Sequence, residues 1–247
     1  MEKYHKYISV GFSLVFVFLV QQFPVNKPIF RIFVLVIAIF LSLLFFYNKR
    51  FLEKQNKYRP LMAFAPVLFY SACVCMFFFL PNDFLKKLFL ILIVPFGSFY
   101  EFFLGNYAES LVLSLNLFSA FFLFSAWSFA NFNFPKYYPI YLCGVFFSAW
   151  IISRSFFEFL PHTNKVKNLV AVVLGLLCCE VYWAENFLPL YPGVLGFLLF
   201  NFFYFVLLMS YYYLFQVLNF KKIQFHLGLI ALTTLLVFLA TPLSVIN

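Results

Sequence analysis

Long apolar segments separated by short polar stretches form the main pattern of this 247-residue chain. A helix needs about 20 apolar residues to cross a bilayer. The pattern predicts nine membrane-spanning helices, at residues 7–23, 29–47, 61–80, 84–104, 111–130, 137–160, 166–183, 195–218 and 225–246. Because the connecting stretches are short, consecutive helices should pack as antiparallel neighbours. The predicted fold is an all-α, polytopic transmembrane helical bundle, a single integral membrane domain over residues 1–247 with no soluble domain.

The fourth segment, residues 84–104, fits the pattern least well. Lys86 and Lys87 lie at one end of it, and Pro95 and Gly97 lie in its middle. Proline removes a backbone donor and glycine loosens the next turn, so a kink or break is expected there. If this segment is re-entrant, the chain has eight spans and every later loop changes sides of the membrane.

Composition places the chain in a lipid environment. Hydrophobic residues make up 65% of it and charged residues 10%, with a mean hydropathy of +0.98. A soluble domain is nearer half apolar and a quarter charged, so the lipid bilayer is the predicted partner. The net charge of +9 would suggest nucleic acid in a soluble protein. Here the basic residues lie between apolar segments, as membrane topology requires, and no nucleic-acid partner is expected.

The distribution of lysine and arginine predicts the orientation. Residues 48–60 hold five of them, and a cytoplasmic position for this loop places eleven on the cytoplasmic side and five on the other. Arg154 lies within a span and is not counted. The positive-inside rule then predicts a cytoplasmic N-terminus and, for nine spans, an outside C-terminus. We expect the plasma membrane of a bacterium.

Several charged residues fall inside or at the ends of the predicted spans. Arg154 and Glu158 are four residues apart, which places them on one helix face as a candidate ion pair. Glu101 and Glu109 lie at a similar depth in the predicted topology. The four side chains form a candidate polar binding pocket or ion-pair network. The alternative is that the glutamates lie at helix ends and reach the headgroup water.

Glu180 lies well inside its predicted span, 13 residues beyond Lys167. Lipid-facing charge is costly, so we expect Glu180 to face the bundle interior as a functional carboxylate, near Asn201 or Tyr204 of the next span or near water that enters from the outer side. The alternative is an interfacial residue in an aromatic belt with Tyr182 and Trp183.

Familiar catalytic and cofactor-binding motifs are missing from the sequence. It contains no Gly-rich phosphate loop, no HExxH and no GxSxG, so no catalytic residue, metal ligand or cofactor is predicted. Glu158 and His162 have helical ligand spacing, but Pro161 lies between them and no third ligand is near. The five cysteines have no zinc or redox spacing and are expected to be buried apolar residues.

Three classes of function remain open. Translocation of a small solute, an ion or a proton is the preferred hypothesis, because charged groups lie inside the spans. A structural or accessory subunit of a membrane complex, as a homo- or hetero-oligomer, is the alternative. A membrane-embedded enzyme that processes lipid is the second alternative, and an enzymatic role is not favoured.

Overall fold

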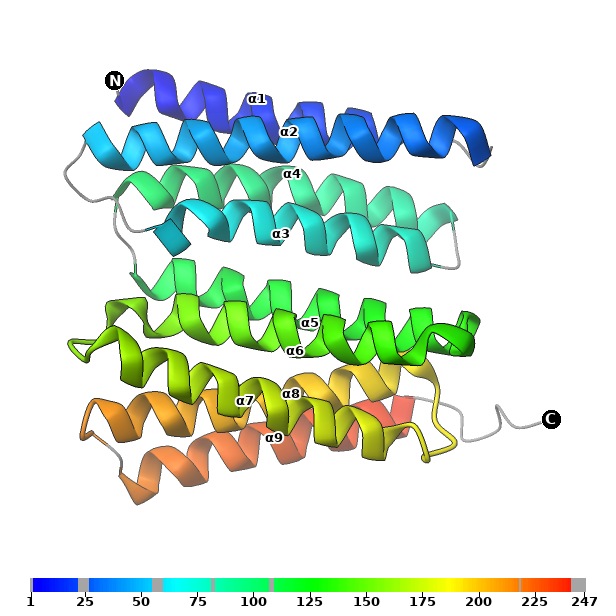
Figure 1. Ribbon diagram of the computed structural model, residues 1–247, viewed down its shortest axis with the longest axis vertical. Helices are drawn as coiled ribbons and strands as arrows, with labels where there is room; N and C mark the ends of the chain where they lie inside the picture. Colours follow the sequence, from blue (N-terminus) through cyan, green and yellow to red (C-terminus); the bar gives the residue numbers. More distant parts are fainter. Residues whose placement is uncertain are drawn as a thin grey trace. The chain divides into compact units, whose positions relative to one another are not determined.

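A computed structural model describes residues 2–21, 27–54, 60–80, 83–106, 109–217 and 219–240 of the protein (Figure 1). Within these ranges the chain is helical and contains no strand. The elements, in order, are α1 (Glu2–Gln21), α2 (Lys27–Lys54), α3 (Pro60–Phe79), α4 (Asp83–Asn106), α5 (Glu109–Asn133), η1 (Pro135–Tyr137), α6 (Tyr138–Phe156), η2 (Phe157–Phe159), α7 (Asn164–Glu185), α8 (Pro192–Leu214) and α9 (Phe220–Ala240). Each predicted segment overlaps one α-helix, and the all-α class is confirmed.

The described helices differ in their suitability for crossing a membrane. Six apolar stretches within the described ranges are long enough to span it: Val34–Lys54, Leu113–Asn133, Pro135–Phe159, Asn164–Glu185, Pro192–Leu214 and Phe220–Leu239. Two further apolar stretches are shorter, Tyr7–Gln21 and Ala63–Phe78. The apolar helices are compatible with a membrane protein. The count of nine spans remains a prediction.

Helix α4 continues through Pro95 and Gly97 without interruption, so the break expected in this segment is wrong. The Pro95 side chain is exposed and leaves the helix packing undisturbed. Gly97 is buried, and a Cβ atom there would lie 2.5 Å from the Tyr70 hydroxyl of α3. The glycine therefore permits a close approach of α3 to α4, and this packing supports the helix across the proline.

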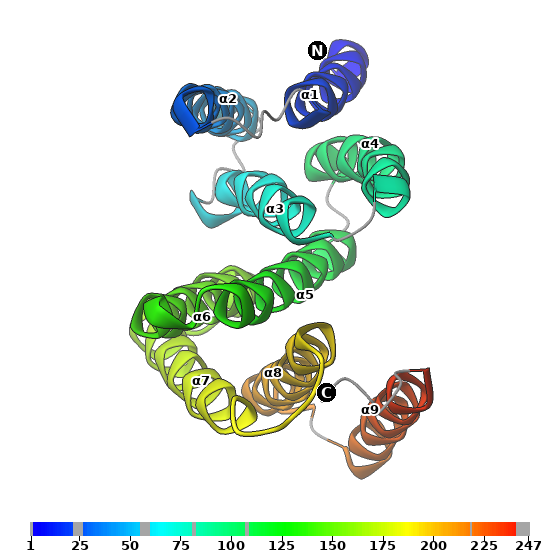
Figure 2. The same cartoon turned by 90° about the vertical axis from the view of Figure 1, so that its right-hand side faces the viewer.

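The chain divides into two compact units, Met1–Ser119 and Ala120–Asn247. In the first unit α1 packs against α4, and α2 packs against α3, as the end-on view in Figure 2 shows. Its core contains Phe16 and Tyr70, whose ring centroids are 4.6 Å apart. The buried Tyr70 hydroxyl is satisfied by a hydrogen bond with the hydroxyl of Ser13 at 2.7 Å.

In the second unit α6 packs against α7, α7 against α8, and α8 against α9. Small residues permit close approaches between these helices. A Cβ atom on Gly175 of α7 would lie 3.2 Å from the carbonyl oxygen of Phe146 on α6. Likewise, a Cβ atom on Gly144 would lie 2.6 Å from the Trp127 ring, whose Nε1 donates a hydrogen bond to Ser148 at 3.1 Å.

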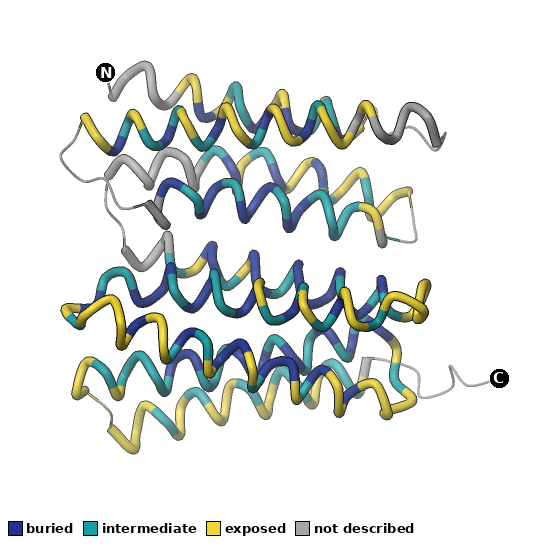
Figure 3. Tube along the Cα trace, viewed as in Figure 1, coloured by how far each residue is buried: buried dark blue, intermediate teal, exposed yellow. Residues whose placement is uncertain are grey.

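Helix α9 is the least buried part of the second unit. No residue of its apolar window is buried, and Figure 3 shows it mainly as exposed. Its contacts with α8 are polar in two places. Asn201 donates a hydrogen bond to the Thr234 hydroxyl at 3.0 Å, and the His226 ring lies 3.1 Å from the hydroxyls of both Tyr204 and Tyr212.

The cysteines are free thiols within these helices. Cys73, Cys178 and Cys179 are buried and Cys75 is partly buried, as expected of small apolar residues. Cys143 is exposed on α6, so the expectation of burial is wrong for this residue.

Candidate functional site

Arg154 and Glu158 form the ion pair that their spacing predicted. Arg154 lies in the last turn of α6, and Glu158 lies in η2, the 3-10 turn that follows. Arg154 Nη1 donates to Glu158 Oε2 at 2.5 Å, and the two side chains are only 12% and 16% exposed. A cation in the last turn of a helix is also favoured by the helix dipole.

Two asparagines of α7 complete the coordination of Arg154. Its Nε donates to Asn168 Oδ1 at 2.8 Å, and its Nη2 donates to Asn164 Oδ1 at 3.0 Å. Lys167 Nζ donates to the backbone carbonyl of Glu158 at 3.3 Å. We call Arg154, Glu158, Asn164, Lys167 and Asn168 the Arg154 cluster. It joins the end of α6 to the start of α7, and the chain itself supplies a counter-charge for the Glu158 carboxylate.

His162 lies in the same turn and contacts another helix. Its Nε2 donates to the backbone carbonyl of Leu214, at the end of α8, at 2.7 Å. Among the described residues no group of three or more His, Cys, Asp or Glu side chains could hold a metal ion.

Glu180 does not face the packed interior of the second unit, so the expected interior position is not found there, whereas its role as a functional carboxylate stays a prediction. Its side chain is exposed on α7, next to the buried Cys179. The expected neighbours Asn201 and Tyr204 make their hydrogen bonds with α9 instead. The physical reason is rotation: each residue turns the helix by about 100°, so one position separates the buried face of α7 from its exposed face.

The side chains of Glu101 and Glu109 lie outside the described residues. Their backbones belong to α4 and α5. The predicted pocket of three glutamates around Arg154 therefore stays a prediction for these two.

Glu185, which the sequence analysis did not select, is the most deeply buried carboxylate among the described side chains. It is the last residue of α7 and only 7% exposed. Its Oε2 is shielded from solvent and has no hydrogen-bond partner, and the described residues provide no ion pair for it. The predicted span ended at Trp183, which left Glu185 in a loop. A helix extended by two residues would have placed Glu185 on the buried face with Cys178 and Tyr182, at helical spacing.

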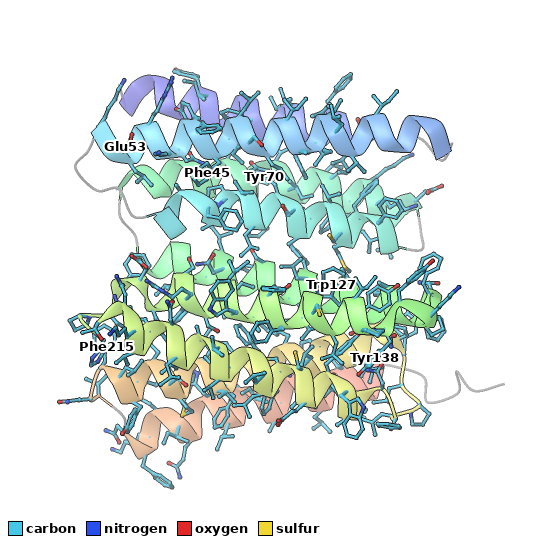
Figure 4. The ribbon with its side chains drawn as sticks, viewed as in Figure 1. Phe45, Glu53, Tyr70, Trp127, Tyr138 and Phe215 are labelled. Carbon is cyan, nitrogen blue, oxygen red and sulfur yellow. The ribbon has the colours of Figure 1, made fainter. Side chains whose placement is uncertain are left out.

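Tyrosines of α6 and α7 surround this end of the unit. The rings of Tyr138 and Tyr182 stack with centroids 6.0 Å apart and planes 7° from parallel. Tyr182 donates its hydroxyl hydrogen to the backbone carbonyl of Trp127 on α5 at 3.1 Å. Figure 4 labels Trp127 and Tyr138 at this end. We call Tyr138, Tyr182, Glu185 and Asn186 the Glu185 site.

A cavity of about 250 Å³ lies beside the Glu185 site. Asn131 and Asn186 line it and are joined by a hydrogen bond from Asn131 Nδ2 to Asn186 Oδ1 at 2.5 Å. Asn186 also donates to the carbonyl of Tyr182 at 2.6 Å. The remaining lining residues come from α5, the α7–α8 connection and α8: Ser128, Phe132, Leu188, Pro189, Leu190, Tyr191, Pro192 and Leu195. Asn186 therefore belongs both to the cavity wall and to the Glu185 site.

The chemistry available at the two ends of α7 differs. The Arg154 cluster is an internally paired network, whereas the Glu185 site offers a buried carboxylate, amide oxygens and phenol groups to a ligand. No family model, no curated protein and no solved structure matches the chain.

Proposed function

We propose that the protein is an integral membrane protein that translocates a small solute or an ion across the bilayer. The observation that supports this proposal is the buried carboxylate of Glu185, whose Oε2 has no hydrogen-bond partner and which forms no ion pair with the described residues. Ionisable side chains within membrane segments are costly, and they commonly mark substrate or ion pathways. Helices that served only as a scaffold would be more stable with an apolar residue at this position.

In this proposal the Arg154 cluster has a supporting role. Its hydrogen bonds fix α6 against α7, and this helix pair carries both Tyr138 and Glu185. A direct solute-binding role for Arg154, Glu158, Glu180, Glu101 or Glu109 is a separate hypothesis, and neutral substitution of each residue in the same flux assay tests it.

The proposed orientation places the N-terminus in the cytoplasm and the C-terminus outside, with nine spans. The Glu185 site then lies near the outer surface and the Arg154 cluster near the cytoplasm. Cysteine labelling tests this arrangement, with Lys54→Cys and Asn247→Cys introduced separately after replacement of the native cysteines. Labelling of both positions from the same side of the membrane would contradict it.

Reconstitution tests the proposed function. The purified protein is placed in liposomes, and movement of rubidium ions, sodium ions and protons is measured under an imposed membrane potential. We expect flux of at least one of them above that of protein-free liposomes. Rates equal to those of the protein-free control for all three would contradict ion translocation and favour the accessory role.

The alternative of an accessory subunit has one observation in its favour. No residue in the apolar window of α9 is buried, so its apolar side chains require a cover of lipid or of a neighbouring protein. Purification in a mild detergent followed by mass measurement distinguishes lipid from a neighbouring protein, because a partner subunit or a second copy adds its mass to the particle.

A further inference from the structure

We infer that the Glu185 site binds a small monovalent cation, either an alkali-metal ion or a proton. The inference rests on the proposed function and deepens it by naming the class of solute. It starts from the burial of Glu185, which is 93% removed from solvent, and from the shielded Oε2 atom that has no partner. An ionised carboxylate in such surroundings needs a neutralising positive charge.

No described basic residue of the second unit forms an ion pair with Glu185. The basic residues of α7, Lys165 and Lys167, lie at its opposite end, and Lys167 is about 27 Å from Glu185 along the helix. Helix α8 contains no Asp, Glu, Lys, Arg or His. Lys136 of η1 is exposed and forms no ion pair with Glu185. The missing charge must therefore come from outside the unit.

The position of Glu185 at the end of α7 strengthens this requirement. The C-terminal end of a helix carries the negative end of its dipole and the last, unpaired carbonyl groups. A carboxylate there is repelled, whereas a cation is attracted both by the carboxylate and by the helix end. The position is unfavourable for stability alone and favourable for binding a positive charge.

The neighbouring groups indicate the size and charge of the ligand. The described residues near Glu185 include no second carboxylate, and no group of His, Cys, Asp and Glu there could hold a divalent metal. Calcium and magnesium are usually held by several oxygen ligands including carboxylates, so a single charge fits the site better. The Tyr138 hydroxyl, which lies beside Asn186, offers a neutral oxygen.

The adjacent cavity provides an approach for such an ion. Its volume of about 250 Å³ exceeds by several-fold the roughly 30 Å³ that one water molecule occupies in the liquid. Asn131 and Asn186 in its wall have amide oxygens that suit a hydrated cation. Asn186 lines the cavity and follows Glu185 directly in the chain, whereas Glu185 itself is not among the lining residues.

Cation-dependent thermal stability tests the inference in the full-length protein in lipid nanodiscs. The wild type is compared with Glu185→Gln and with Glu180→Gln, a matched control on the exposed face of α7. Sodium or potassium replaces N-methylglucamine at constant ionic strength. We expect the melting temperature of wild type and Glu180→Gln to rise by several degrees, and that of Glu185→Gln to stay unchanged, because only a ligand of the folded state stabilises it.

A second series of melting experiments, without alkali ions and between pH 5 and 8, tests whether the bound cation is a proton. The titratable side chains around Glu185 are Cys178 and Tyr182 of α7 and Tyr138 and Tyr141 of α6. Thiols and phenols ordinarily remain neutral up to about pH 8. If the cation is a proton, wild type and Glu180→Gln gain stability relative to Glu185→Gln as the pH falls, by the same mass action.

Equal responses of all three proteins to alkali ions and to pH would overturn the inference. If Glu185→Gln does not fold, the experiment uses Glu185→Asp in its place. This variant should bind the cation at least tenfold more weakly, because its shorter side chain displaces the carboxylate. An unchanged affinity would again overturn it. Cation binding without flux in liposomes would refute translocation but not the site. Flux in the wild type together with equal cation responses of wild type and Glu185→Gln would refute the site but not translocation.

Discussion

A shielded carboxylate lies near each end of α7, and the two differ in whether a basic residue pairs with them. At the N-terminal end, Glu158 lies 2.5 Å from Arg154, and two asparagines each accept a further hydrogen bond from that guanidinium. At the C-terminal end, Glu185 is buried among apolar residues and tyrosines with no basic residue paired to it. The first arrangement is complete without a ligand, and the second is not. The difference separates a charge that holds two helices together from a charge that is available to a solute.

The largest effect on this comparison is expected from Arg154→Leu. The substitution removes the guanidinium from a partly buried ion pair, and breaking such a pair costs about 3 kcal/mol. The double variant Arg154→Leu with Glu158→Leu should recover part of that loss. Chemical unfolding in detergent micelles measures both free energies. Equal stability of the single and double variants would show that the pair contributes no coupling.

A smaller effect is expected from Asn168→Ala. Arg154 Nε loses its acceptor, and a hydrogen bond to a charged group contributes about 1.5–3 kcal/mol. Because Asn168 is exposed, water replaces part of this contact, and we expect a loss of about 1 kcal/mol. The same unfolding experiment measures it, with Asn133→Ala as a control for an exposed asparagine that bonds only to its own helix. A loss no greater than in the control would remove Asn168 from the cluster.

At the Glu185 end, a neutral substitution should raise the stability of the protein, whereas the substitutions at the Arg154 cluster lower it. In a buffer without small cations and at pH 8, Glu185→Gln removes an uncompensated buried charge and should stabilise the protein, on the order of 1 kcal/mol. The melting temperature relative to wild type measures the change. A clear destabilisation would mean that the carboxylate has a partner that the amide cannot replace, and the contrast between the two ends would disappear.

The smallest effect is expected from Glu180→Gln. The side chain is exposed on α7, and substitutions at such positions usually change stability by less than about 0.5 kcal/mol. Flux in liposomes should also match the wild type. Loss of flux with normal folding would show that Glu180 takes part in translocation. The exposed face of α7 that carries it would then contact something other than lipid.

The sequence predicted the helices well because hydrophobic length is a local property. It also predicted the Arg154–Glu158 pair, since both residues lie on one turn of one helix. It did not predict Asn164 and Asn168 as partners, because their position depends on the reversal of the chain between α6 and α7.

The two errors on α7 have separate physical causes. The interior position of Glu180 was predicted from its depth along the span, whereas burial depends on rotation about the helix axis. Glu185 was overlooked because hydropathy ended the helix at Trp183, two residues early. In α4, Pro95 predicted a break that tertiary packing around Gly97 and Tyr70 overrides.

The division of the chain at Ser119 has a spectroscopic consequence. The three tryptophans, Trp127, Trp150 and Trp183, belong to the unit formed by Ala120–Asn247. Tryptophan emission therefore reports the unfolding of that unit alone, whereas far-ultraviolet circular dichroism reports every helix. Two transitions that occur at different denaturant concentrations would give the stability of each unit separately, and coincident transitions would show that the chain unfolds as one cooperative structure.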